Sequence, residues 1–166
     1  MDGVNSRRLV AVLLLLGLVA AGCGWKPPGA PPPEPDICKP TDGPAVDTVA
    51  AAIHGLPPPQ NGASWHEIAN GHTKDCRLYW VQVSAGGDDA APQQLLLFNK
   101  NTTLGTATPN PRPYTTVIAA GHDTVTVQYQ WQQGGDQPGR PTGIAQVRFQ
   151  LDADGKLKAL DAIPNR

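Results

Sequence analysis

Apolar and polar residues alternate with a period of two through the second half of the chain, and this pattern constrains the fold more than any other feature. Residues 125–131 alternate valine, tyrosine and tryptophan with threonine and glutamine, and residues 147–151 alternate valine, phenylalanine and leucine with arginine and glutamine. Successive side chains of a strand point to opposite faces of a sheet. The pattern therefore predicts antiparallel strands with one face buried and the other in water.

Six strands are predicted from the alternation and from the Gly, Pro, Asn and Asp clusters that separate the apolar segments. They cover residues 78–84, 93–99, 114–119, 124–132, 143–152 and 156–163. Residues 95–98 are continuously apolar, which is typical of a strand covered on both faces. Between the last two strands we expect a hairpin turn with Gly155 at positive φ. A calcium loop is the alternative, but the glutamate that closes such a loop is missing.

An amphipathic helix is predicted before the strands, over residues 45–54. Val46, Val49, Ala50 and Ile53 recur there at helical spacing, and the prolines at 57–59 prevent the helix from continuing. Residues 60–75 are expected to form a loop with a short helical turn at 65–69. The resulting α+β domain has the helix packed on one face of an antiparallel β-meander of five to six strands, where it covers the buried face.

The N-terminal residues have the pattern of an export signal. Arg7 and Arg8 precede a short apolar run, and Cys23 follows Ala-Ala-Gly. The run is shorter than the roughly 20 residues of a membrane span, so we expect residues 1–22 to be a signal peptide. A cysteine at this place is typical of bacterial lipoproteins, in which the thiol receives a diacylglycerol and becomes the N-terminus. The expected location is the extracytoplasmic face of the cell membrane, and the export route, Sec or twin-arginine, stays open.

Residues 23–37 are rich in proline, which cannot donate backbone hydrogen bonds, so we expect a stalk between the lipidated cysteine and a single domain over residues 38–166. Cys38 and Cys76 remain after Cys23 is lipidated. In an oxidising compartment they are predicted to form a disulfide. The formal net charge of −1, with basic residues scattered singly, argues against nucleic acid as a partner.

Several short segments together resemble the LppP/LprE family of mycobacterial lipoproteins. They are LLFNK at 96–100, LGTAT at 104–108, VTVQYQW at 125–131, VRF at 147–149 and LDAIP at 160–164. The similarity spans residues 38–164, and in this family the cysteine pair, a tryptophan equivalent to Trp65 and the Leu-Gly-Thr-Ala segment occur together. The resemblance implies a cell-envelope lipoprotein. It brings no catalytic or ligand-binding residues.

No catalytic or metal-binding pattern stands out downstream of the signal. The four histidines lack metal-site spacing, and neither Ser64 nor Ser84 lies in a nucleophile elbow. We therefore expect a protein that is not an enzyme and uses no metal or cofactor.

A binding protein would depend on aromatic side chains outside the strand pattern. Trp65 and Tyr114 are predicted to rim a pocket, with Gln128, Gln130 and Arg148 as polar contacts. The expected partner is an envelope protein or an envelope component such as a glycolipid. The alternative is a carrier or receptor for a small lipid or sugar. A cavity between helix and sheet would favour the carrier, and an exposed apolar patch would favour the partner-binding protein. The oligomeric state stays open.

Overall fold

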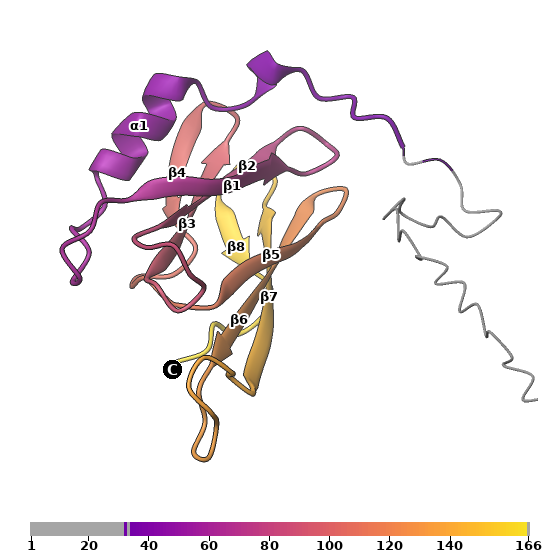
Figure 1. The fold of residues 1–166 in the computed structure, drawn as a ribbon. Helices are drawn as coiled ribbons and strands as arrows, with labels where there is room; N and C mark the ends of the chain where they lie inside the picture. The colour runs from indigo at the N-terminus through magenta and orange to yellow at the C-terminus, as the bar shows by residue number, and fades with distance from the viewer. Residues whose placement is uncertain (1–31, 33, 166) are drawn as a thin grey trace, which may run out of the picture. The chain divides into compact units, whose positions relative to one another are not determined.

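The computed structural model describes residues 32 and 34–165. The chain divides into two units, Met1–Glu34 and Pro35–Arg166, of which the second is the folded unit shown in Figure 1. The predicted signal peptide at 1–22, the lipidation site Cys23 and most of the predicted stalk lie outside the described residues.

The folded unit contains two short helices and eight strands. The helices are the 3-10 helix η1 (Pro40–Asp42) and the α-helix α1 (Val46–His54); the strands are β1 (His66–His72), β2 (Leu78–Ser84), β3 (Gln93–Asn99), β4 (Thr102–Thr106), β5 (Thr115–Ala120), β6 (Thr124–Trp131), β7 (Gly143–Leu151) and β8 (Leu157–Ala159). They form two four-stranded antiparallel sheets, β1-β2-β3-β4 and β5-β6-β7-β8. The α+β class is thus broadly confirmed, but the single meander of five to six strands was wrong.

The chain leaves the first sheet after β4 because the next segment cannot extend the ladder. Pro109, Pro111 and Pro113 fall within residues 107–114 and have no backbone N–H to donate. The Ala107 N–H still bonds the Leu95 carbonyl at 2.9 Å, and further along the segment one isolated bridge, Gln93 to Arg112, joins it to β3 in the described residues. The second meander then packs against the first, and the central core holds residues from both sheets: Leu78, Leu95, Leu97, Val125, Val127, Tyr129, Val147, Phe149 and Leu151.

The helix covers a different face from the one predicted. Val49, Ala52 and Ile53 of α1 pack against a second cluster made of Tyr79, Val81, Val83, Leu96 and Phe98, on the opposite face of the first sheet (Figure 1). The buried face of β6 and β7 is covered by the first sheet instead. The alternation in these two strands is confirmed. The double-sided burial of residues 95–98 is confirmed as well, because Leu95 and Leu97 face one cluster and Leu96 and Phe98 the other.

A side chain from the β3–β4 turn holds the start of α1. The Asn101 Oδ1 atom accepts hydrogen bonds from the Ala45 N–H and from the Thr48 hydroxyl, each at 2.8 Å. Asn101 therefore satisfies the backbone N–H of the N-cap residue Ala45, one of the donors that the helix itself leaves unpaired, although Asn101 is remote in sequence.

The loop expected over residues 60–75, with its helical turn at 65–69, is wrong at its centre, because residues 66–72 are strand β1 and pair antiparallel with β2. The segment is mostly polar and largely exposed, so it lacks the alternation that predicts a strand. The hairpin turn at 152–156 is confirmed. Gly155 has φ of 76°, and the Asp152 N–H bonds the Lys156 carbonyl at 2.9 Å. Strand β8 is shorter than predicted.

The Cys38–Cys76 disulfide is present, with Cα atoms 5.5 Å apart and a sequence separation of 38 residues. It joins the segment that enters the folded unit to the turn between β1 and β2. The Cys76 backbone in that turn has a positive φ of 56°. The bond therefore fixes where the N-terminal segment meets the first sheet.

Replacing both cysteines, Cys38→Ser with Cys76→Ser, is expected to lower the free energy of unfolding by about 3 to 4 kcal/mol, because the unfolded chain regains the entropy of a loop of this length. Urea unfolding of the oxidised protein and of the double variant measures this difference. The reduced wild-type protein is the control and should match the variant. A loss below about 1 kcal/mol would contradict the prediction.

Candidate functional site

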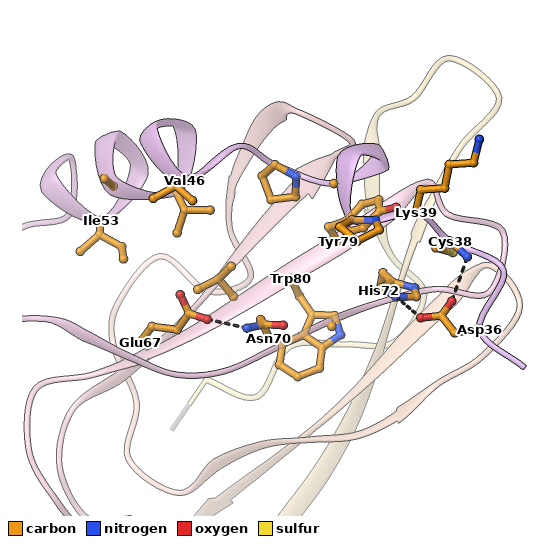
Figure 2. A pocket seen from close by; sticks show the side chains of 17 residues that line it. Asp36, Cys38, Lys39, Val46, Ile53, Glu67, Asn70, His72, Tyr79 and Trp80 are labelled. Atoms are coloured by element: carbon orange, nitrogen blue, oxygen red, sulfur yellow. Dashed lines mark hydrogen bonds and ion pairs between the residues drawn. The ribbon is translucent and has the colours of Figure 1, made fainter. Parts of the chain in front are cut away.

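A groove of about 600 Å³ lies between α1 and the first two strands (Figure 2). One wall is apolar and consists of Val46, Val49, Ala50 and Ile53 of the helix. The other wall is polar and consists of Glu67, Asn70 and His72 of β1. Tyr79 and Val81 of β2 form the floor, and the segment from Asp36 to Gly43 closes one end.

The groove exists because the helix lies toward one side of the sheet. Asn101 ties the start of α1 to the β3–β4 turn. Strand β1 is at the other edge of the same sheet, so its helix-facing side stays uncovered. The register places His72 opposite Tyr79 and Asn70 opposite Val81, which brings the polar wall and the floor onto one face.

The hydroxyl of Tyr79 is the least expected group in this groove. The side chain is only 6 % exposed, and its hydroxyl oxygen has no hydrogen-bond partner among the described residues. Burial raises the pKa of Tyr79, and the nearby carboxylates of Asp42, Asp36 and Asp75 raise it further. The phenol is therefore neutral and able to donate a hydrogen bond at physiological pH. A buried hydroxyl without a partner costs free energy, which an acceptor would recover if it displaced the atoms that cover the hydroxyl.

The N-terminal segment lies directly against the Tyr79 ring. A Cβ atom added to Gly43 would lie 2.7 Å from the ring, so only glycine allows this approach. Trp80, the next residue of β2, borders the groove but packs against the core between the sheets. Its ring lies over Gly71, where an added Cβ would be 2.7 Å away. The Trp80 indole N–H is also buried without a hydrogen-bond partner among the described residues, so the groove is lined by two residues with unpaired donors, Tyr79 and Trp80.

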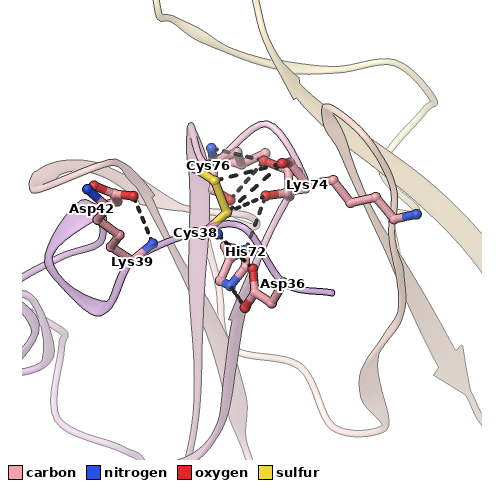
Figure 3. A network of polar contacts seen from close by, with 9 residues as sticks. Asp36, Cys38, Lys39, Asp42, His72, Lys74 and Cys76 are labelled. Atoms are coloured by element: carbon pink, nitrogen blue, oxygen red, sulfur yellow. Dashed lines mark hydrogen bonds and ion pairs between the residues drawn. A yellow bond between two sulfur atoms is a disulfide. The ribbon is translucent and has the colours of Figure 1, made fainter. Parts of the chain in front are cut away.

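Polar contacts beside the disulfide hold the closed end of the groove in place (Figure 3). The Asp36 carboxylate lies 3.1 Å from Nε2 of His72 and accepts the Cys38 N–H at 2.9 Å. The Asp42 carboxylate accepts the Lys39 N–H at 2.8 Å. Nδ1 of His72 lies 3.1 Å from the Thr73 carbonyl, so the ring sits between two acceptors.

Asp36, Cys38 and His72 also bring three possible metal ligands within 4.8 Å of one another. The Cys38 sulfur belongs to the disulfide and is not the thiolate that binds metals. Two ligands remain, and Asp36 is 61 % exposed. We assign no metal to this cluster.

None of the five predicted ligand contacts lines the groove. Trp65 is half-buried against the helix-side cluster, and its indole N–H donates to the Pro57 carbonyl at 2.9 Å. Tyr114 precedes β5 with φ of 51°, and its backbone bonds Asp89. Gln128 and Gln130 are half-buried on β6 in the second sheet. A common pocket rimmed by Trp65 and Tyr114 does not appear among the described residues, and ligand contact by the five residues stays a prediction.

Arg148, the fifth of these residues, is paired within the protein. Its Nε and one terminal nitrogen each donate to the Asp161 carboxylate at 2.9 Å, and its backbone N–H donates to the same group at 3.0 Å. These hydrogen bonds and the guanidinium charge lower the pKa of Asp161 to about 2. A ligand would have to compete with Asp161 for this side chain.

The site residues Tyr79, His72 and Asp36 were missed from the sequence. The sequence pattern makes Tyr79 an ordinary core residue of a predicted strand, and it places Asp36 in the predicted stalk. One signal was available, because the predicted disulfide places residues 36–38 beside residues 72–76.

The Arg148–Asp161 pair is expected to make the free energy of unfolding depend on pH below about pH 4. The pKa of Asp161 is lower in the folded state than its ordinary 3.8, so its contribution is present above pH 4 and is lost as the pH falls toward 2. The Asp161→Asn variant should therefore lose less stability than wild type between pH 4 and pH 2, as measured by urea unfolding. In the Arg148→Gln variant the pKa of Asp161, measured by NMR titration, should rise back toward 3.8. A wild-type midpoint near 3.8 would contradict the prediction.

No helix within residues 34–165 is long and apolar enough to cross a membrane. Residues 70–154 match the model of the LppP/LprE lipoprotein family. The protein named "Putative lipoprotein LppP" in Mycobacterium tuberculosis, and its namesake in Mycobacterium bovis, are 53 % identical to this chain over 153 residues, which cover 92 % of this chain and 87 % of each relative. No solved structure gives a significant match. The chain therefore belongs to the LppP/LprE lipoprotein family.

Proposed function

We propose that this protein is a non-enzymatic, lipid-anchored protein of the cell envelope that carries or receives a small amphiphilic ligand in the groove beneath α1. The observation that carries the proposal is the buried, unpaired Tyr79 hydroxyl at the floor of a groove with an apolar helix wall. Binding sites for small molecules are concave and mostly apolar, with a few polar groups that orient the ligand. The volume of about 600 Å³ is in the range of such sites.

The lipid anchor is part of the same proposal. Membership of a lipoprotein family supports lipid anchoring, and the sequence pattern at 1–23 supports a signal peptide cleaved before Cys23. The diacylglycerol on Cys23 would hold the protein at the extracytoplasmic face of the membrane. The residues between Cys23 and the groove, if extended, reach about 35 to 40 Å, which keeps the groove within reach of the envelope lipids.

The charged groups of the groove support binding rather than catalysis. His72 and Asp36 form the one pair there suited to proton transfer. Among the described lining residues there is no serine or threonine, and Cys38 is part of the disulfide, so the pair has no serine, threonine or cysteine nucleophile to activate. The Glu67 carboxylate accepts a hydrogen bond from the Asn70 amide at 2.6 Å.

Binding of a partner protein is the second candidate, and the exposed edge of β1 favours it. Strand β1 pairs only with β2 in the first sheet, and Ile68 within it is 46 % exposed. An extended peptide could add to such an edge. A co-purifying protein that crosslinks to β1 would favour this candidate over a small ligand.

Filling the groove is expected to abolish ligand binding. Ala50 lies on the exposed surface of α1 and lines the groove, so a tryptophan at this position would occupy the space without disturbing the core. The measurement is native mass spectrometry of the protein extracted from a mycobacterial envelope. Wild type should retain a ligand mass, and Ala50→Trp should retain at least about tenfold less.

The matched control for Ala50→Trp is Ala51→Trp, on the same helix and also exposed, but outside the groove lining. It should keep the ligand. If wild type carries no ligand, or if both variants keep it equally, the proposed function is wrong.

Removing the Tyr79 hydroxyl is expected to weaken binding without weakening the fold. The Tyr79→Phe variant loses a buried group that has no partner in the described residues, so its free energy of unfolding should stay equal or rise by up to about 1 kcal/mol, while ligand affinity falls about tenfold. Tyr129→Phe is the matched control. The Tyr129 hydroxyl is also buried and unpaired, but it lies between the sheets, so ligand affinity should not change. Destabilisation of Tyr79→Phe by more than about 1 kcal/mol would show that its hydroxyl is already bonded.

A further inference from the structure

The described residues that line the groove include two carboxylates and one lysine. Asp36 and Glu67 line the groove, and Asp42 and Asp75 lie close enough to the Tyr79 hydroxyl to act on it electrostatically. The carboxylates of Asp36, Asp42 and Asp75 thus act on the buried Tyr79 hydroxyl. The Trp80 indole N–H is a second unpaired donor among the described residues that line the groove. These groups come from the N-terminal segment and from the β1–β2 turn, which the disulfide joins.

The lysine of the groove lining extends away from the carboxylates inside the groove (Figure 2). Lys39 lines the groove, but its side chain extends away from the groove (Figure 2), and its backbone N–H is what bonds Asp42. The His72 ring is held by the Asp36 carboxylate at 3.1 Å.

The apolar part of the groove is narrow and short. Its wall is a single helix face from Val46 to Ile53, which is about 10 Å long at 1.5 Å per residue. The opposite wall is polar, with Glu67, Asn70 and His72. One short alkyl chain along the helix fits this arrangement, with its head group at the Tyr79 hydroxyl.

We infer that the groove selects single-chain amphiphiles with a neutral, hydroxyl-bearing head group and rejects those with an anionic head group; this inference rests on the proposed function. A hydroxyl both accepts and donates, so it pairs with the Tyr79 O–H and with a neighbouring carboxylate such as Asp36. A carboxylate or phosphate head group accepts from Tyr79 as well, but it brings like charges together in a partly desolvated site. The carboxylates therefore decide between ligands that have the same chain.

The test compares three probes with the same chain length: 1-monodecanoylglycerol, decyl glucoside and decanoate. The protein is the full mature chain with Cys23→Ser, which removes only the lipid, and affinity is measured by isothermal titration calorimetry at neutral pH below micelle-forming concentrations. Both neutral probes should bind at least about tenfold more tightly than decanoate. The ratio between the two neutral probes distinguishes a glycerol head group from a sugar head group. The preference over decanoate should shrink as salt is added, because screening weakens the repulsion.

A charge variant tests the cause of the preference. Asp36→Asn with Asp42→Asn should raise the affinity for decanoate about tenfold and bring it close to that of 1-monodecanoylglycerol. Asp88→Asn with Asp154→Asn removes the same charge outside the groove lining and should leave the preference unchanged. If the first variant does not fold, the wild-type comparison and its salt dependence still decide the question.

The outcomes separate this inference from the proposed function. Decanoate binding as tightly as the neutral probes, with all binding lost in Ala50→Trp, would overturn the head-group inference and leave the groove as the binding site. If no probe binds to the wild-type protein, this inference is overturned. If Ala50→Trp and Ala51→Trp also retain the same amount of ligand in the native mass spectrometry experiment, the proposed function is overturned too.

Discussion

The double-sided burial of strands β2 and β3 is the constraint on which the rest of the structure depends. Leu95 and Leu97 require cover on one face and Leu96 and Phe98 on the other. The second sheet supplies the first cover, and α1 supplies the second. One helix of nine residues cannot cover four strands, so the sheet keeps an uncovered strip along β1. The groove follows from this shortage of cover rather than from a separate binding element.

The disulfide gives that strip its chemical character. It brings a segment with Asp36 and Asp42 to the end of the sheet where Tyr79 is buried. The Asp36–His72 contact and the close approach of Gly43 to the Tyr79 ring support the same placement. Covalent attachment therefore determines the polarity of the groove as well as contributing to the stability of the fold.

Local patterns predicted the elements better than their arrangement. Alternation in residues 125–131 and 147–151 indicates which side chains are buried, but it does not indicate what covers them. A fold with one meander and a fold with two packed meanders therefore have the same sequence pattern in these strands. The polar strand β1 was missed because an edge strand with an uncovered face has no alternation to detect. Tyr79 was missed for the opposite reason, since a groove floor and a core have the same residue pattern. Trp65 was singled out as an aromatic residue outside the strand pattern, but it packs under the helix-side cluster.

Asn101 lies outside the groove lining, yet it determines where the helix wall stands. Its side chain is the contact through which the β3–β4 turn holds the first turn of α1. A longer or shorter turn at this place would move the helix relative to β1 while the two sheets stayed as they are. A two-residue connection outside the groove thus sets the width of the groove, and a change in its length would widen or narrow the groove without any change to the two cores.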